Sequence, residues 1–379
     1  MKPRILPLVT MIIISCVILS LLYTSASISK QQWSALRLMD SGLPQLHAIV
    51  TNSSQPQTSD AHVDRILVVY SGPTDLMDQN IKKQKISSAH KKMELYRLNF
   101  EFFLRHGIHC QTQDTLIVVT GVVAAKYQAQ IDELHNRCHH DYGNFVRIIT
   151  RNNTCYDLES VRVALEFAEN SDRPAVETNR RTKNDPNFTA FYDFFVYVNC
   201  GVTGPSLQWT NRPWTSIFLE KLRDGVKMTG LSINCEMAGH PHVQSMMYAM
   251  DREGLQFVVD GGAIYDCKTR PDHAGLTGVP FQGMIIWEYE IKMSDLLLHA
   301  GYGISSVVMP TALLGHNSSQ CLNKHGNETV KDIWITNHMN EYLGKVPSLD
   351  DVVFFKTSRI LTPETANLIN FTLDVDWNW

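Results

Sequence analysis

A run of aromatic and β-branched residues near the middle of the chain constrains the fold most. Residues 194–201 read FFVYVNCG, and the first five offer no charged face, so they predict a strand that is buried on both sides. Asn199, Gly201 and Pro205 then belong to a cluster of turn residues. Ligands of open α/β sheets bind beyond the carboxyl ends of such strands, so a site is expected at these residues. The alternative is a core strand followed by an ordinary surface turn.

Strand and helix patterns alternate along the rest of the chain. Buried strands are predicted at 65–73, 115–121 and 145–149, and helices at 91–106, 127–138 and 157–169. Beyond the central strand we predict a helix after 213–214, a strand at 226–236, a helix that ends at 252, a short strand at 255–259 and a helix at 287–300. The alternation predicts one α/β domain, Rossmann-like, with a mostly parallel sheet flanked by helices.

The first 64 residues predict a membrane anchor and a stem. Residues 1–4 carry two basic side chains, and residues 5–23 are uncharged and long enough to cross a bilayer as a helix. Positive charges stay on the cytosolic side, so we expect a single-pass type II protein in which polar residues 24–64 form a stem and residues 65–379 a lumenal domain. A cleavable signal peptide is the alternative, but its apolar core is usually only about 7–15 residues long.

Glycosylation signals and cysteines agree with a lumenal domain. Asn-x-Ser/Thr sequons begin at Asn52, Asn152, Asn187, Asn317, Asn327 and Asn370. Seven of the eight cysteines follow the predicted anchor, where oxidation is permitted. We predict a disulfide between Cys235 and Cys267, because each ends a strand in the same half of the sheet. These features predict a protein of the Golgi or ER membrane.

Composition and cysteine spacing exclude two classes of protein. The hydrophobic share of 44% and the charged share of 19% are typical of an enzyme-sized globular domain. The net charge is −4 and no basic tract is present, so we expect no nucleic-acid partner. No Cys-x-x-Cys or Cys/His cluster has the spacing of a structural zinc site.

Five polar residues are candidates for a site, each with a structural alternative. Asp157 precedes a helix, where an acid is by default an N-cap worth about 1 kcal/mol, yet it also follows a strand and could hold a sugar or nucleotide hydroxyl. His240 and His242 are two positions apart, so on an extended segment their side chains would lie on the same face and could form a metal or substrate pair. Such histidines are more often structural. Glu288 and Glu290 lie in a first helical turn, where carboxylates also favour the helix dipole.

The order of several short motifs resembles glycosyltransferases of the GT-A type. In chain order these motifs are NTCYD (153–157), VYVNCG (196–201), HVQS (242–245), DREGL (251–255) and AGY (300–302). The first is similar to the Asn-x-x-x-Asp loop that holds the nucleotide, and the second takes the place of the strand ending in Asp-x-Asp. Glu290, before a Leu-rich helix that ends in AGY, resembles the acidic residue that acts as catalytic base. The resemblance covers roughly residues 65–309.

This resemblance implies an enzyme that moves a sugar from a nucleotide-sugar donor to a hydroxyl of a glycan, glycoprotein or lipid acceptor. Glu290 would be the general base, with Glu288 as the alternative. His242 and Asp251 would line the acceptor side or hold that wall in place. The implied donor-binding residues are Asn153, Asp157, Asn199 and Gly201.

One departure from the family pattern concerns the metal ion. Asn199 and Gly201 stand where two carboxylates would hold Mg²⁺ or Mn²⁺ on the donor diphosphate. Both ions favour carboxylate oxygens, so we expect weak dependence on a divalent metal, with Asp157 and His316 as the remaining candidate ligands. Without an ion, the leaving diphosphate would need cationic or backbone N–H donors.

Two other classes of function stay open. A lumenal sulfotransferase would share the anchor and the α/β core, but the SGPT segment at 71–74 is only a faint version of a phosphosulfate loop, because it has no nearby Lys or Arg. A non-catalytic carbohydrate-binding or scaffold protein would account for the missing Asp-x-Asp pattern.

Overall fold

The computed structural model describes one part of the chain in detail. The described residues are 64–76, 88–152, 156–170, 191–206, 212–234, 240–264, 286–307, 313–314 and 353–357. All of them belong to the unit His62–Trp379. Among the helices in these ranges, none is both long and apolar enough for a membrane span. The predicted tail, anchor and most of the stem lie outside the described residues, as do Asn153, His316 and the predicted Cys235–Cys267 pair.

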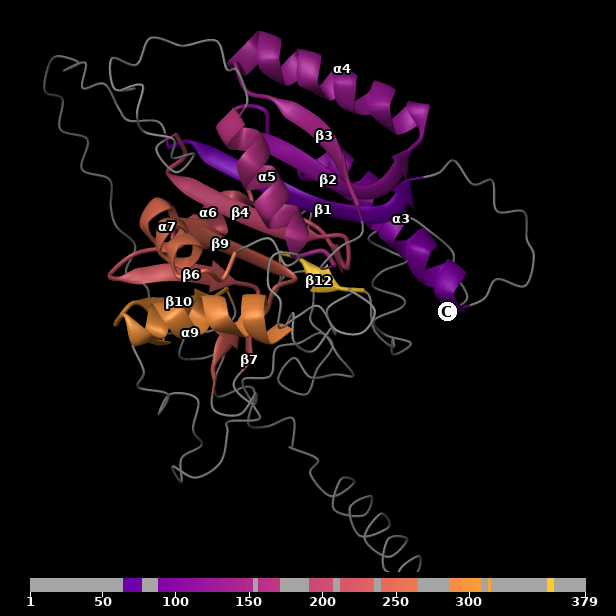
Figure 1. Cartoon of the computed structure of the whole chain (residues 1–379). Helices are drawn as coiled ribbons and strands as arrows, with labels where there is room; N and C mark the ends of the chain where they lie inside the picture. The colour runs from indigo at the N-terminus through magenta and orange to yellow at the C-terminus, as the bar shows by residue number, and fades with distance from the viewer. Residues whose placement is uncertain are drawn as a thin grey trace, which may run out of the picture. The chain divides into compact units, whose positions relative to one another are not determined.

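An eight-stranded sheet forms the centre of the described domain, in the order β11-β10-β6-β9-β4-β1-β2-β3 (Figure 1). The strands are β1 (Ile66–Leu76), β2 (Gln113–Val123), β3 (Val146–Arg151), β4 (Phe194–Asn199), β6 (Val226–Gly230), β9 (Met247–Asp251), β10 (Gly303–Ser306) and β11 (Leu313–Leu314). The pairs β1–β2, β1–β4, β2–β3 and β6–β10 are parallel. Strand β9 is antiparallel to β4 and β6, and β11 is antiparallel to β10. The predicted α/β fold with a mostly parallel sheet is therefore confirmed.

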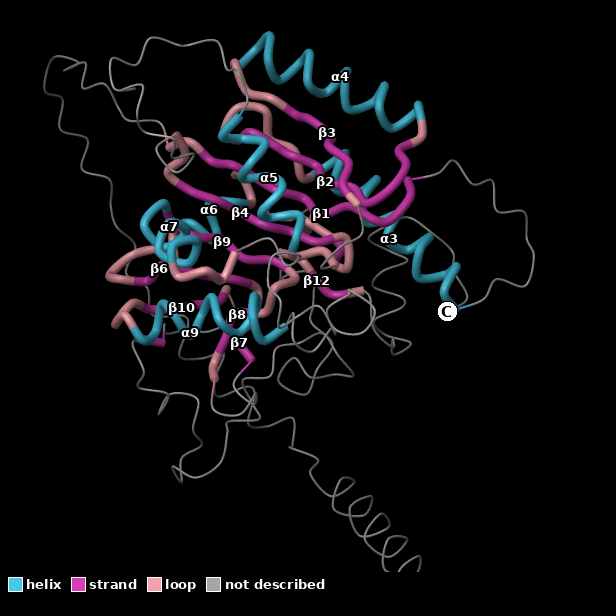
Figure 2. Tube along the Cα trace, viewed as in Figure 1, coloured by secondary structure: helices cyan, strands magenta, loops and turns pink. Residues whose placement is uncertain are grey.

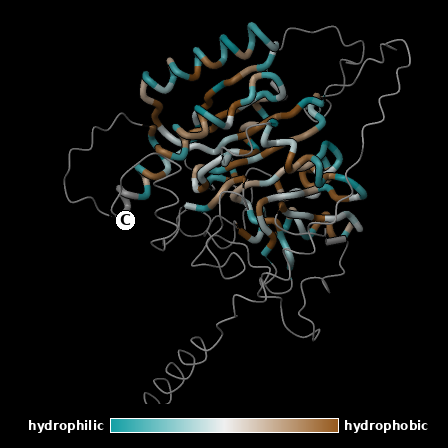
Figure 3. The backbone as a smooth tube through the Cα atoms, turned by 180° about the vertical axis from the view of Figure 1, so that it is seen from behind, coloured by the Kyte–Doolittle hydropathy of each residue, from teal (hydrophilic) through white to brown (hydrophobic). Residues whose placement is uncertain are grey.

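Helices cover both faces of this sheet (Figure 2). They are α3 (Ser88–His106), α4 (Ala125–Tyr142), α5 (Glu159–Asn170), α6 (Thr215–Leu219), α7 (Arg252–Asp260), the π-helix η5 (Ile286–Ile291) and α9 (Lys292–His299). Alternate strand residues face opposite sides, so Leu67 and Val69 pack with α5, α7 and α9, whereas Val68 and Tyr70 pack with α3, α4 and α6. Figure 3 shows hydrophilic residues along much of α4, which lies at the outside of its layer.

The assignment around residue 250 was wrong in the sequence analysis. A helix ending at 252 and a strand at 255–259 were predicted, but the structure has strand β9 first and helix α7 second. The apolar run of β9 is too short to distinguish helix from strand by periodicity, and pairing with β4 and β6 decides it. Asp251 accepts a hydrogen bond from Gly254 N at 2.8 Å and caps α7, a local signal for the helix start.

The predicted strand at 226–236 divides in two. Strand β6 ends at Gly230, and β7 (Ile233–Asn234) pairs with β8 (His242–Val243) in a separate small sheet. A Cβ atom at Gly230 would lie 2.4 Å from Val243 Cγ1, so only glycine allows β8 to cross so closely. This crossing brings His242 to the carboxyl edge of the main sheet.

Two long-range connections tie other segments to the domain. Strand β12 (Phe355–Lys356) pairs with β5 (Val202–Thr203), so a C-terminal segment lies beside the turn that follows β4. Cys110 and Cys138 form a disulfide that joins the segment before β2 to α4. Cys200 is buried and free.

Candidate active site at the carboxyl edge of the sheet

Asn199, the last residue of β4, organises one half of the candidate site. Its side-chain nitrogen donates to Asp157 Oδ2 at 2.9 Å, and its Oδ1 accepts from Gly201 N at 2.9 Å. Its backbone nitrogen donates to Met246 O at 3.0 Å. Because both ends of the amide are engaged, the side chain is held in one orientation.

Asp157 does not cap the helix that follows it with its carboxylate. The carboxylate instead accepts from Asn199 and from the Tyr197 hydroxyl, the latter at 3.3 Å, while the backbone carbonyl accepts from Ser160 N. Tyr156 directly before it has a left-handed backbone with φ 56° and an exposed ring. The Asp157 side chain is therefore turned towards Asn199 and Tyr197 and not back to the start of α5.

A guanidinium lies beside this pair and was missed by the sequence analysis. Arg151, at the end of β3, donates from Nε to Ser160 Oγ at 3.0 Å and from its terminal nitrogens to the carbonyls of Asn152 and Tyr156. Ser160 Oγ also lies 2.9 Å from Ser71 Oγ. Burial lowers the pKa of Arg151, opposed by the nearby negative charges. Its place at the end of a strand was the one local signal that could have found it.

Glu290 organises the second half of the site. It lies in the π-helix η5, and such helical irregularities are frequent at functional sites. Ser245 Oγ donates to Glu290 Oε2 at 2.6 Å, and His242 Nε2 lies 3.7 Å from Oε1. His242 Nδ1 donates to His240 O at 2.9 Å, so in neutral His242 the other nitrogen presents a lone pair towards Glu290.

The structure separates the other candidates from these two groups. Glu288 Oε2 lies 3.8 Å from Lys292 Nζ. Asp251 pairs with Phe194, the first residue of β4, so it lies about 16 Å along the strand from Asn199. There it caps α7 and bonds Lys227 Nζ at 2.7 Å. Asp251 therefore caps a helix at the other end of β4 from Asn199, away from the acceptor side to which it was assigned.

Two buried tyrosines, Tyr197 and Tyr248, lie beside the Asp157 group. The rings of Tyr197 and Tyr248 are 5.1 Å apart, and the Tyr248 hydroxyl has no hydrogen-bond partner within the described ranges. Burial, together with the charges of Asp157 and Glu290, raises the pKa of Tyr248 above its usual range. Tyr248 pairs directly with Tyr197 across β9 and β4, and the Tyr197 hydroxyl in turn bonds Asp157.

The donor atoms here do not match a divalent-metal site. Asp157 supplies one carboxylate, and the side-chain oxygen of Asn199 is already bonded to Gly201 N. Across the parts of the chain that the structure describes, no three His, Cys, Asp or Glu side chains come together as a metal-binding group. His240 and His242 do not form a metal pair either, because His240 bonds Asp295 and His242 faces Glu290.

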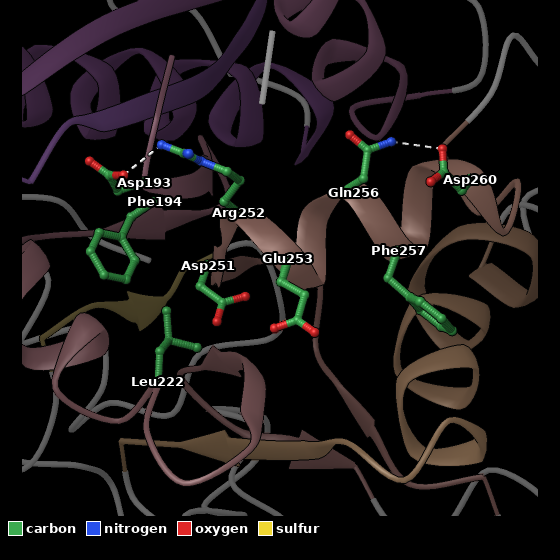
Figure 4. A pocket seen from close by; sticks show the side chains of 9 residues that line it. All are labelled: Asp193, Phe194, Leu222, Asp251, Arg252, Glu253, Gln256, Phe257 and Asp260. Atoms are coloured by element: carbon green, nitrogen blue, oxygen red, sulfur yellow. Dashed lines mark hydrogen bonds and ion pairs between the residues drawn. The ribbon is translucent and has the colours of Figure 1, made fainter. Parts of the chain in front are cut away.

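A cavity of about 670 Å³ lies at the opposite edge of the sheet (Figure 4). Its lining residues are Asp193, Phe194, Leu222, Asp251, Arg252, Glu253, Gln256, Phe257 and Asp260. Its acidic groups are engaged by partners within the domain, including the Arg252–Asp193 ion pair at 2.6 Å. The cavity surrounds the start of β4 rather than its end, so it is separate from the candidate site.

The SGPT segment at 71–74, which was weighed as a faint version of a phosphosulfate loop, is not a loop. Residues 71–74 continue strand β1, which extends to Leu76 with shifts in register against β2. Ser71 Oγ and Ser160 Oγ are hydrogen-bonded at 2.9 Å. The strand–loop–helix that a sulfotransferase needs does not form at these residues.

No protein-family model matches the chain, and no curated protein matches it in sequence. Among solved structures, it is similar to the mannosyltransferase PcManGT from Pyrobaculum calidifontis in complex with GDP-Man and Mn²⁺, with 9% identity, a TM-score of 0.33 and coverage of 65% of this chain and 55% of that chain. It is also similar to mouse xyloside xylosyltransferase 1 in its apo form, with 8% identity and a TM-score of 0.28. The match covers 63% of this chain and 82% of that chain. Similarity at this level transfers neither protein's activity to this chain.

Proposed function

We propose that this protein is a GT-A-like glycosyltransferase that moves a sugar from a nucleotide-sugar donor to an acceptor hydroxyl. The observation that supports this most is the placement of Glu290, held by Ser245 and faced by His242, on the same sheet edge as the Asn199–Asp157 pair. Asn199 N bonds the carbonyl of Met246, the residue next to Ser245, so the two groups are joined by one backbone contact.

In this proposal the Asp157 half binds the donor. Asp157 Oδ2 is occupied by Asn199 and Tyr197, and no described residue bonds Oδ1, so Oδ1 would accept from a ribose or sugar hydroxyl. Arg151 supplies positive charge beside it for the diphosphate. Gly201 fixes the Asn199 amide, because its backbone N–H donates to Asn199 Oδ1 at 2.9 Å.

The Glu290 half performs the proton transfer. The acceptor hydroxyl gives its proton to Glu290 Oε1 as its oxygen attacks the anomeric carbon. The bond between that carbon and the donor phosphate breaks, and the nucleoside diphosphate leaves with the electron pair. Ser245 holds the other carboxylate oxygen, so Oε1 is aimed beside His242. A base that acts in this way corresponds to direct displacement at the anomeric carbon.

We place this reaction in the lumen of the Golgi or ER. The basic residues before the uncharged segment at 5–23 and the six sequons support a type II orientation. The Cys110–Cys138 disulfide supports an oxidising compartment. Digestion of sealed microsomes tests this placement, because protease should reach residues beyond 64 only after detergent is added.

Nucleotide binding by the full-length protein tests the proposed activity. Thermal unfolding is measured with UDP, GDP and the phosphoadenosine nucleotide, followed by transfer assays with the matching nucleotide sugars. We expect stabilisation by UDP or GDP and product formation with one donor. Stabilisation by the phosphoadenosine nucleotide alone would indicate a sulfotransferase, and stabilisation by none would indicate a non-catalytic protein.

A further inference from the structure

An exposed tryptophan lies in the same π-helix as the candidate base. Trp287 lies in η5, three residues before Glu290, and 42% of its surface is exposed. A single exposed apolar residue is ordinary in a soluble domain and by itself marks nothing. Trp287 differs from such a residue because it contacts His240, which is linked to Glu290.

The indole of Trp287 contacts a histidine whose orientation is fixed. The rings of Trp287 and His240 are 5.4 Å apart at 78°, an edge contact that covers at most one indole face. His240 Nδ1 lies 3.0 Å from Asp295 Oδ1, so the imidazole is held in place. Among the described residues nothing bonds its Nε2, which remains able to bind a hydroxyl. The result is an aromatic surface with a polar atom at its border.

This surface is connected to Glu290 by a short chain of contacts. His240 O accepts from His242 Nδ1, and His242 Nε2 faces Glu290 Oε1 at 3.7 Å. Two residues of extended chain span only about 7 Å, so one small ligand could contact His240 and Glu290 together. The aromatic surface therefore lies where the acceptor must approach the base.

We propose that Trp287 and His240 form an acceptor subsite for a sugar ring, so that the acceptor is a glycan. This inference rests on the proposed transferase activity and specifies its substrate. A pyranose has an apolar face of C–H groups and a rim of hydroxyls, which matches an indole face with a polar imidazole beside it. The ring stacks on Trp287, one hydroxyl bonds His240 Nε2, and the attacking hydroxyl reaches Glu290.

The test measures acceptor recognition separately from donor recognition. The full-length protein is titrated with methyl glycosides of glucose, galactose, mannose, xylose and N-acetylglucosamine, and indole fluorescence reports binding. Acceptor KM is then measured for the best glycoside. Trp287→Ala removes the ring and Trp287→Phe keeps a smaller one, while Tyr142→Ala removes an exposed aromatic residue of α4 as the matched control. Trp287→Leu replaces Trp287→Ala if the latter lowers the melting temperature.

We expect Trp287→Ala to raise acceptor KM by about threefold to tenfold, with a smaller rise for Trp287→Phe and none for Tyr142→Ala. UDP or GDP should still stabilise all variants. If the wild type binds a nucleotide and transfers sugar to Ser/Thr peptides or lipids but never to glycosides, the glycan subsite is wrong while the transferase remains. An unchanged glycoside KM in Trp287→Ala would also overturn it. Absence of nucleotide binding by the wild type rejects the proposed function itself.

Discussion

Ser245 donates its hydroxyl hydrogen to Glu290 Oε2 at 2.6 Å, across 45 residues of sequence. The bond joins the segment after β8 to the π-helix η5 and leaves the second carboxylate oxygen facing His242. A carboxylate that is held at one oxygen and open at the other is suited to accept a proton from a bound hydroxyl.

Glu290→Gln should remove most turnover and leave nucleotide affinity nearly intact. The amide keeps the size of the side chain and can still accept from Ser245, but it cannot take the acceptor's proton, a contribution of typically about 10²–10⁴-fold. The effect should appear in kcat rather than in donor binding. Glu288→Gln is the matched control, because Glu288 is directed to Lys292. A dead Glu288→Gln with an active Glu290→Gln would mean that the base is the other carboxylate.

Wild-type donor binding should survive EDTA, whereas Asn199→Asp should make it depend on Mn²⁺. The substitution places a second carboxylate against Asp157 Oδ2, where Asn199 now donates at 2.9 Å. Repulsion should weaken nucleotide affinity by about tenfold or more, and a divalent ion that bridges the two carboxylates should restore it. Calorimetric titration with and without Mn²⁺ measures both effects. Loss of wild-type binding in EDTA would show that metal ligands come from other residues.

Asn99→Ala should destabilise the domain and weaken nucleotide binding. Buried Asn99 donates to Cys200 O at 2.8 Å and to Thr357 Oγ1 at 2.7 Å, and accepts from Thr203. The groups left unpaired should cost about 2–4 kcal/mol of unfolding free energy, measured in urea. Thr357→Ser keeps the hydroxyl and should retain most of that stability. An unchanged nucleotide affinity in Asn99→Ala would show that this network does not support the turn after β4.

Loss of the Cys110–Cys138 disulfide should lower stability without affecting the site. The bridge closes a loop across a sequence separation of 28, and the loop-entropy relation gives about 3–4 kcal/mol. A Cys110→Ser/Cys138→Ser variant measured by urea unfolding tests the value. Peptide mapping of the unreduced wild type is the direct check, and finding both residues as free thiols would contradict the structure.

Tyr248→Phe and Tyr197→Phe should change stability in opposite directions. The buried Tyr248 hydroxyl has no partner among the described residues, so removing it should be neutral or stabilising by up to about 1 kcal/mol. Tyr197 OH donates to Asp157, so its removal should destabilise the fold. Melting temperatures of the two variants give the sign directly. A clear loss of stability in Tyr248→Phe would mean that its hydroxyl is paired in solution.

Local patterns in the sequence were enough to predict most of the α/β core. The strands β1 to β4 and the helices α3 to α5 lie where apolar runs and helical spacing placed them. Such patterns indicate whether a strand or helix is buried on one face or on both, and they can be read from residues that are close in sequence. The existence of strand β9 in place of a helix was not predictable in this way, because pairing with β4 and β6 determines it.

The sequence by itself also determined which residue types follow the central strand: Asn199 and Gly201 instead of two carboxylates. Only the tertiary structure decided what those residues contact. Asp157 meets Asn199 across 42 positions, and Glu290 meets Ser245 across 45. The Gly230 crossing that admits β8, and with it His242, likewise depends on chain segments that are distant in sequence. Periodicity describes how a segment divides between core and solvent, whereas the contacts of a site depend on which strand ends the fold brings together.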